Sequence, residues 1–110
     1  MVTNIFNNIS AAASEEIFDV LLERKGIKIE RIVSTGQSTP QGEWYDQKQD
    51  EWVILLQGSA GIRYHCNDKV QLMMQGDFVH IPAGKKHRVE FTDKNKTTVW
   101  LAVHFLLKEN

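Results

Sequence analysis

The sequence has a single cysteine and no long apolar run, and each of these two absences excludes a class of protein. Cys66 has no second cysteine with which to form an internal disulfide, so a disulfide-stapled secreted scaffold is excluded. No stretch reaches the length of a membrane-spanning helix, and residues 1–13 lack the basic region and apolar core of a signal peptide. We therefore expect a cytoplasmic protein with no membrane partner.

Net charge is also nearly absent, and several catalytic motifs are missing. The formal charge is −1, with 13 basic and 14 acidic residues. A nucleic-acid-binding domain usually carries a basic stripe, so we expect no nucleic-acid partner. The sequence has no glycine-rich phosphate loop, no nucleophile elbow and no Cys–His pair at a suggestive spacing. Phosphoryl transfer and acyl-enzyme chemistry therefore have no candidate residues.

The first part of the chain, residues 1–26, predicts a short amphipathic helix. Ser14 can cap the helix, and Glu15 and Glu16 would lie at the positive end of its dipole. The apolar residues that follow have three-to-four spacing, and Gly26 can end the helix in a left-handed conformation. At 110 residues the whole chain is the size of one domain, so we expect this helix to pack against the rest of it.

From residue 27 to residue 110 the sequence predicts an all-β barrel or sandwich. Short apolar or alternating runs are separated by turn residues, and we expect strands at 52–57, 61–66, 70–74, 78–81, 87–91 and 98–107. Two of them, 52–56 and 99–107, are apolar on both faces. One face would fill the barrel, and either the N-terminal helix or a second copy of the chain would cover the other. Trp52 and Trp100 are candidates either for contacts in a homodimer or for burial within the monomer.

The motif with the clearest chemical meaning spans residues 76–87. An apolar run, Phe78–Ile81, can form a strand that ends at Pro82, because proline cannot donate to a sheet. Gly84 completes a turn, and His87 then opens a second run that alternates with period two. The motif therefore delivers one imidazole to a defined place just beyond a turn.

This motif resembles the second motif of the cupins, which runs Gly, five residues, Pro-x-Gly, two residues, His, three residues and Asn. Only the last position differs, where Phe91 stands in place of Asn. The frame of the first cupin motif is met by three upstream residues, Gly42, Glu51 and Gly58. The resemblance covers roughly residues 27–107 and implies a double-stranded β-helix, or jelly-roll, barrel.

The His-x-His pair of the first cupin motif is absent from this sequence. With a four-residue spacer before Glu51 its positions fall on Trp44 and Asp46, and with a three-residue spacer they fall on Tyr45 and Gln47. The resemblance implies that Glu51 and His87 face each other inside the barrel. Period two would add Val53, Leu55, Val89 and Phe91 to the same apolar surroundings. A buried charged group there costs several kcal/mol without a partner or a metal.

The candidate metal ligands are Asp46, Glu51 and His87, two carboxylates and one imidazole suited to Fe²⁺, Mn²⁺, Ni²⁺ or Zn²⁺. Gln47 is the fallback if the shorter spacer applies. His104, in the middle of an apolar terminal strand, could complete the shell. Alternatively, His104 is a core histidine that is hydrogen-bonded to Glu51 or to the backbone.

The candidate ligand-binding residues are Trp44, Tyr45, Gln47 and Phe91. The two rim aromatics either line a small-molecule pocket or cap the open end of the barrel. The leading functional hypothesis is a metal-dependent cupin that binds or transforms a small polar metabolite, with dioxygenase, isomerase and lyase chemistry all compatible with the fold. The alternative is a non-catalytic binding module that has lost its metal. A structural role through the helix and the apolar sheet face is a third possibility.

Overall fold

The computed structural model describes residues 1–10 and 13–106, and its regular structure is entirely β. The eight strands are β1 Ile17–Arg24, β2 Ile27–Ser34, β3 Asp50–Gln57, β4 Ser59–Tyr64, β5 Gln71–Met74, β6 Phe78–Ile81, β7 His87–Thr92 and β8 Thr98–Phe105. The expected end of the last strand at residue 107, and the end of the barrel at residue 110, lie outside the described residues. Within the described part of the chain, no helix is long and apolar enough to cross a membrane.

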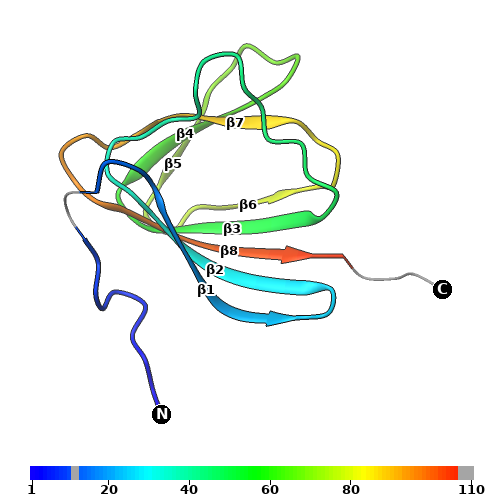
Figure 1. Ribbon diagram of the computed structural model, residues 1–110. Helices are drawn as coiled ribbons and strands as arrows, with labels where there is room; N and C mark the ends of the chain where they lie inside the picture. Colours follow the sequence, from blue (N-terminus) through cyan, green and yellow to red (C-terminus); the bar gives the residue numbers. More distant parts are fainter. Residues whose placement is uncertain (11–12, 107–110) are drawn as a thin grey trace.

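The strands form two sheets that face each other (Figure 1). The larger sheet has the order β1-β2-β8-β3-β6 and the smaller has the order β5-β4-β7. Every strand pair is antiparallel. The last strand, β8, lies between β2 and β3, which gives the crossed connectivity of a jelly roll. The all-β prediction is therefore confirmed.

The core lies between the two sheets and is built from alternate residues of the central strands. On β3 the side chains of Val53 and Leu55 face inward, and on β8 those of Trp100 and Ala102 do so. Leu55 is fully enclosed, and burial of a leucine side chain stabilises a fold by about 1.5–3 kcal/mol. Trp100 is only 3% exposed, so of the two interpretations for this tryptophan the structure supports burial within the monomer.

Residues 17–24 form a strand, so the predicted N-terminal helix is wrong. β1 pairs with β2 from Ile17 to Arg24, with a bulge between Val20 and Leu22. The turn between the two strands contains Gly26 at φ +83°, where a Cβ atom would lie 2.9 Å from a backbone carbonyl oxygen. A short helix on its own is marginal in water. Pairing with β2 satisfies the same backbone groups in a sheet, and this tertiary contact overrides the apolar spacing.

Candidate functional site

A cavity of about 70 Å³ lies between the sheets, and its polar lining is strongly acidic. Its polar residues are three carboxylates, two imidazoles and an amide: Glu16, Glu30, Glu51, His87, His104 and Gln47. The remaining lining is aromatic or aliphatic: Phe18, Ile32, Tyr45, Val53, Ile62, Ile81, Val89 and Trp100. No lysine or arginine is among the lining residues that the structure describes.

His87, the first residue of β7, is held in one orientation by the turn before it. Its Nδ1 lies 3.0 Å from the carbonyl oxygen of Lys85. A carbonyl oxygen can only accept a hydrogen bond, so we assign the ring hydrogen to Nδ1, which leaves a lone pair on Nε2 of the neutral imidazole. Nε2 lies 3.6 Å from Oε1 of Glu51. The ring of Tyr45 stacks on the imidazole, with 5.5 Å between centroids. Nε2 of His87 therefore lies on the cavity side of the ring, near the carboxylate of Glu51.

Glu51 stands between the two histidines of the cavity. Its Oε2 lies 3.9 Å from Nε2 of His104, which is its partner across the β3–β8 ladder. Nε2 of His104 also lies 2.8 Å from Oε1 of Glu30, on the other neighbouring strand, β2. The hydrogen-bond partner of His104 is therefore Glu30, and not Glu51 or the backbone as the sequence suggested. All four side chains belong to buried residues, with exposed fractions of 5–8%.

Glu16, immediately before β1, brings a third carboxylate to the cavity. The hydroxyl of Ser34 donates a hydrogen bond to Glu16 and accepts one from Nε1 of Trp100 at 3.1 Å. Burial raises the pKa of Glu16, and the hydrogen bond from Ser34 opposes that shift. The pKa of Tyr45 is also raised, by burial and by the charges of Glu16 and Glu51, so its phenol remains neutral at neutral pH.

The structure decides between the two spacings of the first motif in favour of the shorter one. Tyr45 and Gln47 line the cavity. An isolated bridge pairs Tyr45 with His87, and alternation along the chain then turns Trp44 and Asp46 outward. Asp46 is exposed and is absent from the cavity lining, and the ring of Trp44 lies on the outside, beneath an arginine side chain.

Phe91 also lies outside the cavity, although Val89 on the same strand lines it. In the pairing of β7 with β4, the register shifts between Gly61 and Ile62, which leaves one extra residue on β7. Such a bulge reverses the alternation beyond it. Thr92 is consequently buried, and Phe91 is 36% exposed. The inward orientation predicted for Phe91 is thus corrected by the bulge.

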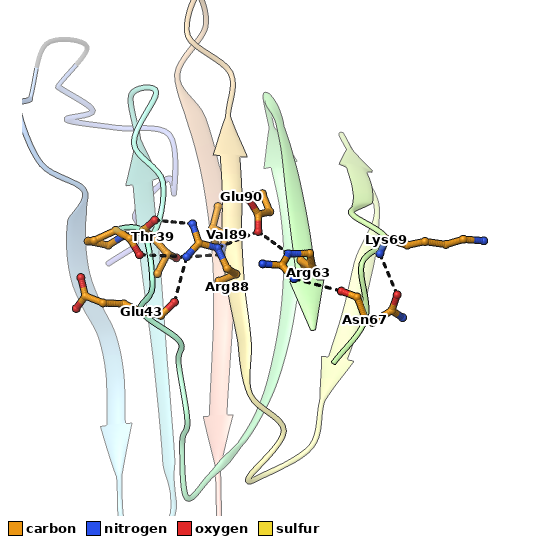
Figure 2. A network of polar contacts seen from close by, with 9 residues as sticks. Thr39, Glu43, Arg63, Asn67, Lys69, Arg88, Val89 and Glu90 are labelled. Carbon is orange, nitrogen blue, oxygen red and sulfur yellow. Dashed lines mark hydrogen bonds and ion pairs between the residues drawn. The ribbon is translucent and has the colours of Figure 1, made fainter. Parts of the chain in front are cut away.

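The loop that carries Tyr45 is anchored from outside the cavity by Arg88, the neighbour of His87 (Figure 2). The guanidinium group donates to three carbonyl oxygens of this loop, those of Thr39, Pro40 and Glu43, at 2.9, 3.1 and 3.2 Å. Its Nε forms an ion pair with Glu90 at 2.9 Å. Because adjacent strand residues face opposite ways, Arg88 can hold the loop without adding its charge to the cavity.

Sequence reasoning missed two of the three carboxylates, Glu16 and Glu30. The available signal for Glu30 was its alternation with Ile32, which placed a carboxylate on the same side of a strand as an apolar residue. Glu16 gave a misleading signal, because an acidic residue after Ser14 is typical of a helix start. Neither residue belongs to the two motifs on which the sequence analysis relied.

While His104 keeps its hydrogen bond to Glu30, the donors are not arranged as a metal site. Tyr45 and Gln47 occupy the positions of the two missing histidines, and a neutral phenol and an amide are poor ligands for transition metals. His87 and Glu51 are available, but Nε2 of His104 is engaged in its hydrogen bond. Among residues 1–10 and 13–106, no three histidine, cysteine, aspartate or glutamate side chains are placed to hold an ion.

A family model described as "Cupin domain" matches residues 31–104, well over half of the chain. The protein is a cupin. The matched residues include Glu51, His87 and His104, whereas Glu16 and Glu30 precede them. A comparison with curated proteins gives no match.

Solved structures support the same assignment. This cupin is 50% identical to a candidate mannose-6-phosphate isomerase from Ralstonia eutropha JMP134, with a TM-score of 0.94 and coverage of 97% of this chain and 99% of the other. A cupin superfamily protein from Desulfitobacterium hafniense DCB-2 is 20% identical, with a TM-score of 0.73 and coverage of 90% and 84%. An RmlC-like cupin with a double-stranded β-helix fold from Methanocaldococcus jannaschii is 15% identical, with a TM-score of 0.69 and coverage of 96% and 92%. The last two show the fold alone.

Proposed function

We propose that this cupin binds a small polar metabolite in the cavity between its sheets and acts on it through His87 and Glu51. The observation that carries the proposal is the convergence of buried ionisable groups on one small cavity. Such groups cost folding free energy unless they are well paired, so their accumulation at one place favours a functional role over a structural one.

His87 and Glu51 are placed to move a proton. Nε2 of His87 keeps its lone pair toward the cavity, so it can accept a proton from a bound molecule. Glu51 lies 3.6 and 3.9 Å from the two imidazoles, which is beyond hydrogen-bond distance, so its carboxylate oxygens are free to accept hydrogen bonds from a ligand. Its carboxylate would stabilise the imidazolium that forms. A non-catalytic binding module, which needs only the hydrogen bonds, is the alternative.

A phosphorylated sugar, the kind of substrate in the name given to the similar protein from Ralstonia eutropha, finds little support in this cavity. A phosphate group is normally held by arginine, lysine or a helix N-terminus. The described lining has no lysine or arginine, and the described residues form no helix. The cavity of about 70 Å³ is also far smaller than the roughly 300–1,000 Å³ of ordinary ligand pockets. We therefore expect a smaller substrate without a phosphate.

The test is a metabolite screen by thermal shift on the wild type and three variants, Glu51→Gln, His87→Gln and His80→Gln. The last is the control, because His80 also contacts a carboxylate but lies on the exposed outer face. We expect a metabolite that stabilises the wild type and the control and has no effect on the two cavity variants. Equal stabilisation of all four proteins would contradict the proposal.

Solvent exchange would then separate turnover from binding. The metabolite found in the screen is incubated with protein in D₂O and followed by NMR. Incorporation of deuterium by the wild type and not by His87→Gln would support proton transfer. Binding without any incorporation would favour the non-catalytic module.

A divalent transition metal is the second candidate occupant, and the orientation of His87 favours it. A hydrogen bond from Nδ1 to a carbonyl oxygen is the usual way in which proteins orient a metal-bound histidine. His87, Glu51 and His104 would hold the metal, once His104 exchanged its bond to Glu30 for the ion. The metal would supply a Lewis acid.

Elemental analysis of untagged protein, purified without chelator, tests this second candidate beside the variants His87→Ala and His80→Ala. About one equivalent of metal per chain, lost only from His87→Ala, would support it. A catalytic metal site usually has three protein ligands, and His87→Ala removes one of the three. A metal-free wild type that also fails to bind added Fe²⁺, Mn²⁺, Ni²⁺ and Zn²⁺ would exclude it.

We also propose a homodimer formed through the outer face of the larger sheet. Its central strands carry half-exposed apolar residues there, and the ring of Trp52 packs 5.4 Å from that of Phe78, which is 61% exposed. An apolar sheet face of this kind usually marks a protein interface. Light scattering of the wild type should give the mass of a dimer, and Phe78→Glu should give that of a monomer.

A cytoplasmic location is proposed on the basis of the free, exposed Cys66.

A further inference from the structure

We propose that the cavity selects a small cationic group, an ammonium or amidinium, over an anionic one. This inference rests on the proposed function, because it names the ligand class of the same cavity. Glu16, Glu30 and Glu51 all line the cavity, and no lysine or arginine is among the described lining residues. An anion placed there would meet carboxylate oxygens from three strands or their flanks, whereas a cation would be attracted by all of them.

The charges around these carboxylates do not neutralise them. Within the described residues, the ion-pair contacts of Glu51 are with the two imidazoles. Glu30 contacts His104 and also Lys28, whose Nζ lies 4.0 Å from the carboxylate and whose side chain is 35% exposed. Glu16 accepts a hydrogen bond from a neutral hydroxyl. With both imidazoles neutral, Lys28 is the one positive charge that contacts any of these three carboxylates within the described residues. The cavity therefore favours an incoming positive charge.

The size and apolar lining of the cavity point to an organic cation. About 70 Å³ has room for a headgroup of a few atoms, since one water takes about 30 Å³ in the liquid. The rings of Phe18, Tyr45 and Trp100 line the same space, and aromatic rings attract organic cations. The carboxylate oxygens of the cavity only accept hydrogen bonds when they are ionised. A planar amidinium matches such oxygens well, because it donates parallel N–H bonds.

The test compares acetamidinium, acetamide and acetate, which have nearly the same shape and differ in charge. NMR titration of the wild-type protein would follow the imidazole signals of His87 and His104 and give a dissociation constant for each probe. We expect acetamidinium to bind at least about tenfold more tightly than acetamide, because charge-assisted hydrogen bonds are stronger than neutral ones. Acetate is expected to cause no saturable change.

Variants locate the selectivity in the carboxylates. Glu51→Gln and Glu16→Gln should each weaken acetamidinium binding by about tenfold and change acetamide binding by less than about threefold, because each removes one charge and keeps the shape. Glu15→Gln, one residue away and exposed, is the matched control and should change neither. Glu16→Gln retains an acceptor for Ser34, so it keeps the test valid if Glu51→Gln fails to fold.

The outcomes distinguish this inference from the proposed function. If acetamide binds as tightly as acetamidinium, or acetate binds best, the charge selection is wrong and the cavity remains a ligand site. If acetamidinium binds but both glutamine variants bind it equally well, the selection does not come from these carboxylates and the inference is overturned. If no probe shifts either imidazole signal, both the inference and the proposed cavity site are contradicted.

Discussion

His104→Ala is expected to destabilise this cupin far more than His80→Ala, although each substitution breaks an imidazole–carboxylate contact of 2.8 Å. The difference lies in burial. The side chains of His104 and its partner Glu30 are 6% and 8% exposed, whereas that of His80 is 51% exposed. Removal of His104 leaves a carboxylate inside the barrel whose nearest remaining positive charge is Lys28 at 4.0 Å. Water can solvate the partner of His80 when that histidine is removed.

The magnitude follows from the cost of an unpaired buried charge. Breaking a buried pair by removing one partner costs about 3–5 kcal/mol. The total stability of a domain is only about 5–15 kcal/mol, so the variant should be close to unfolding. For a domain of this size, each kcal/mol lowers the melting temperature by roughly 4–8 °C. We therefore expect His104→Ala to melt at least about 12 °C below the wild type.

Thermal and urea unfolding, both monitored by tryptophan fluorescence, are the assays, because buried Trp100 lies in the same cavity. The double variant His104→Ala with Glu30→Gln should recover part of the lost stability, since it removes the stranded charge. A loss below about 1 kcal/mol for His104→Ala, the size typical of a surface pair, would refute the reasoning. No recovery in the double variant would show that lost packing, and not the charge, was the cause.

The remaining predictions concern three other parts of the structure. Gly58→Ala should destabilise the fold by several kcal/mol, because φ is +91° and the new Cβ would lie 2.7 Å from Cα of Thr98. Gly76 has a similar φ but open space around it, so Gly76→Ala should lower the free energy of unfolding by only about 1–2 kcal/mol in the same urea assay. Glu16→Gln should stabilise the fold at neutral pH, because burial raises the pKa of Glu16 and so penalises its charged form above the unfolded-state pKa of about 4.3. The gain in stability should vanish below that pH. A gain that persists there would contradict this explanation. Arg88→Ala should loosen the loop that carries Tyr45, with faster amide hydrogen exchange at residues 39–45. Unchanged exchange would show that the loop is held by other contacts.

Much of the barrel was predictable from the sequence because its signals are local. The strand Phe78–Ile81 has the predicted bounds. The expected strands at 52–57 and 87–91 lie within β3 and β7, which are longer by two residues and one residue at one end. Pro82 ends β6 and Gly58 separates β3 from β4, and period-two alternation correctly placed Val53 and Leu55 beside Glu51. The inward orientation of His87 and Glu51 was predicted through the cupin resemblance.

The sequence failed where the structure of a segment depends on its pairing with another strand. The N-terminal segment has helical spacing, but β2 offers it an open edge and the segment becomes a strand. Phe91 is turned outward by a bulge that belongs to the pairing with β4 and has no mark of its own in the sequence. The three-residue and four-residue spacers of the first motif were equally compatible with the amino-acid sequence, and the bridge between Tyr45 and His87 decided between them.

By itself, the sequence predicted a small β-barrel, and its cupin resemblance implied that one histidine and one glutamate face the interior. Those conclusions depend on turn chemistry, alternation and motif spacing, which act over a few residues. Only the tertiary structure decided that Glu16 and Glu30 join them and that His104 binds Glu30. The acidic cavity is assembled from residues on or beside β1, β2, β3, β4, β6, β7 and β8. The electrostatic field of such a site depends on distances across sheets, which spacing along the chain does not encode.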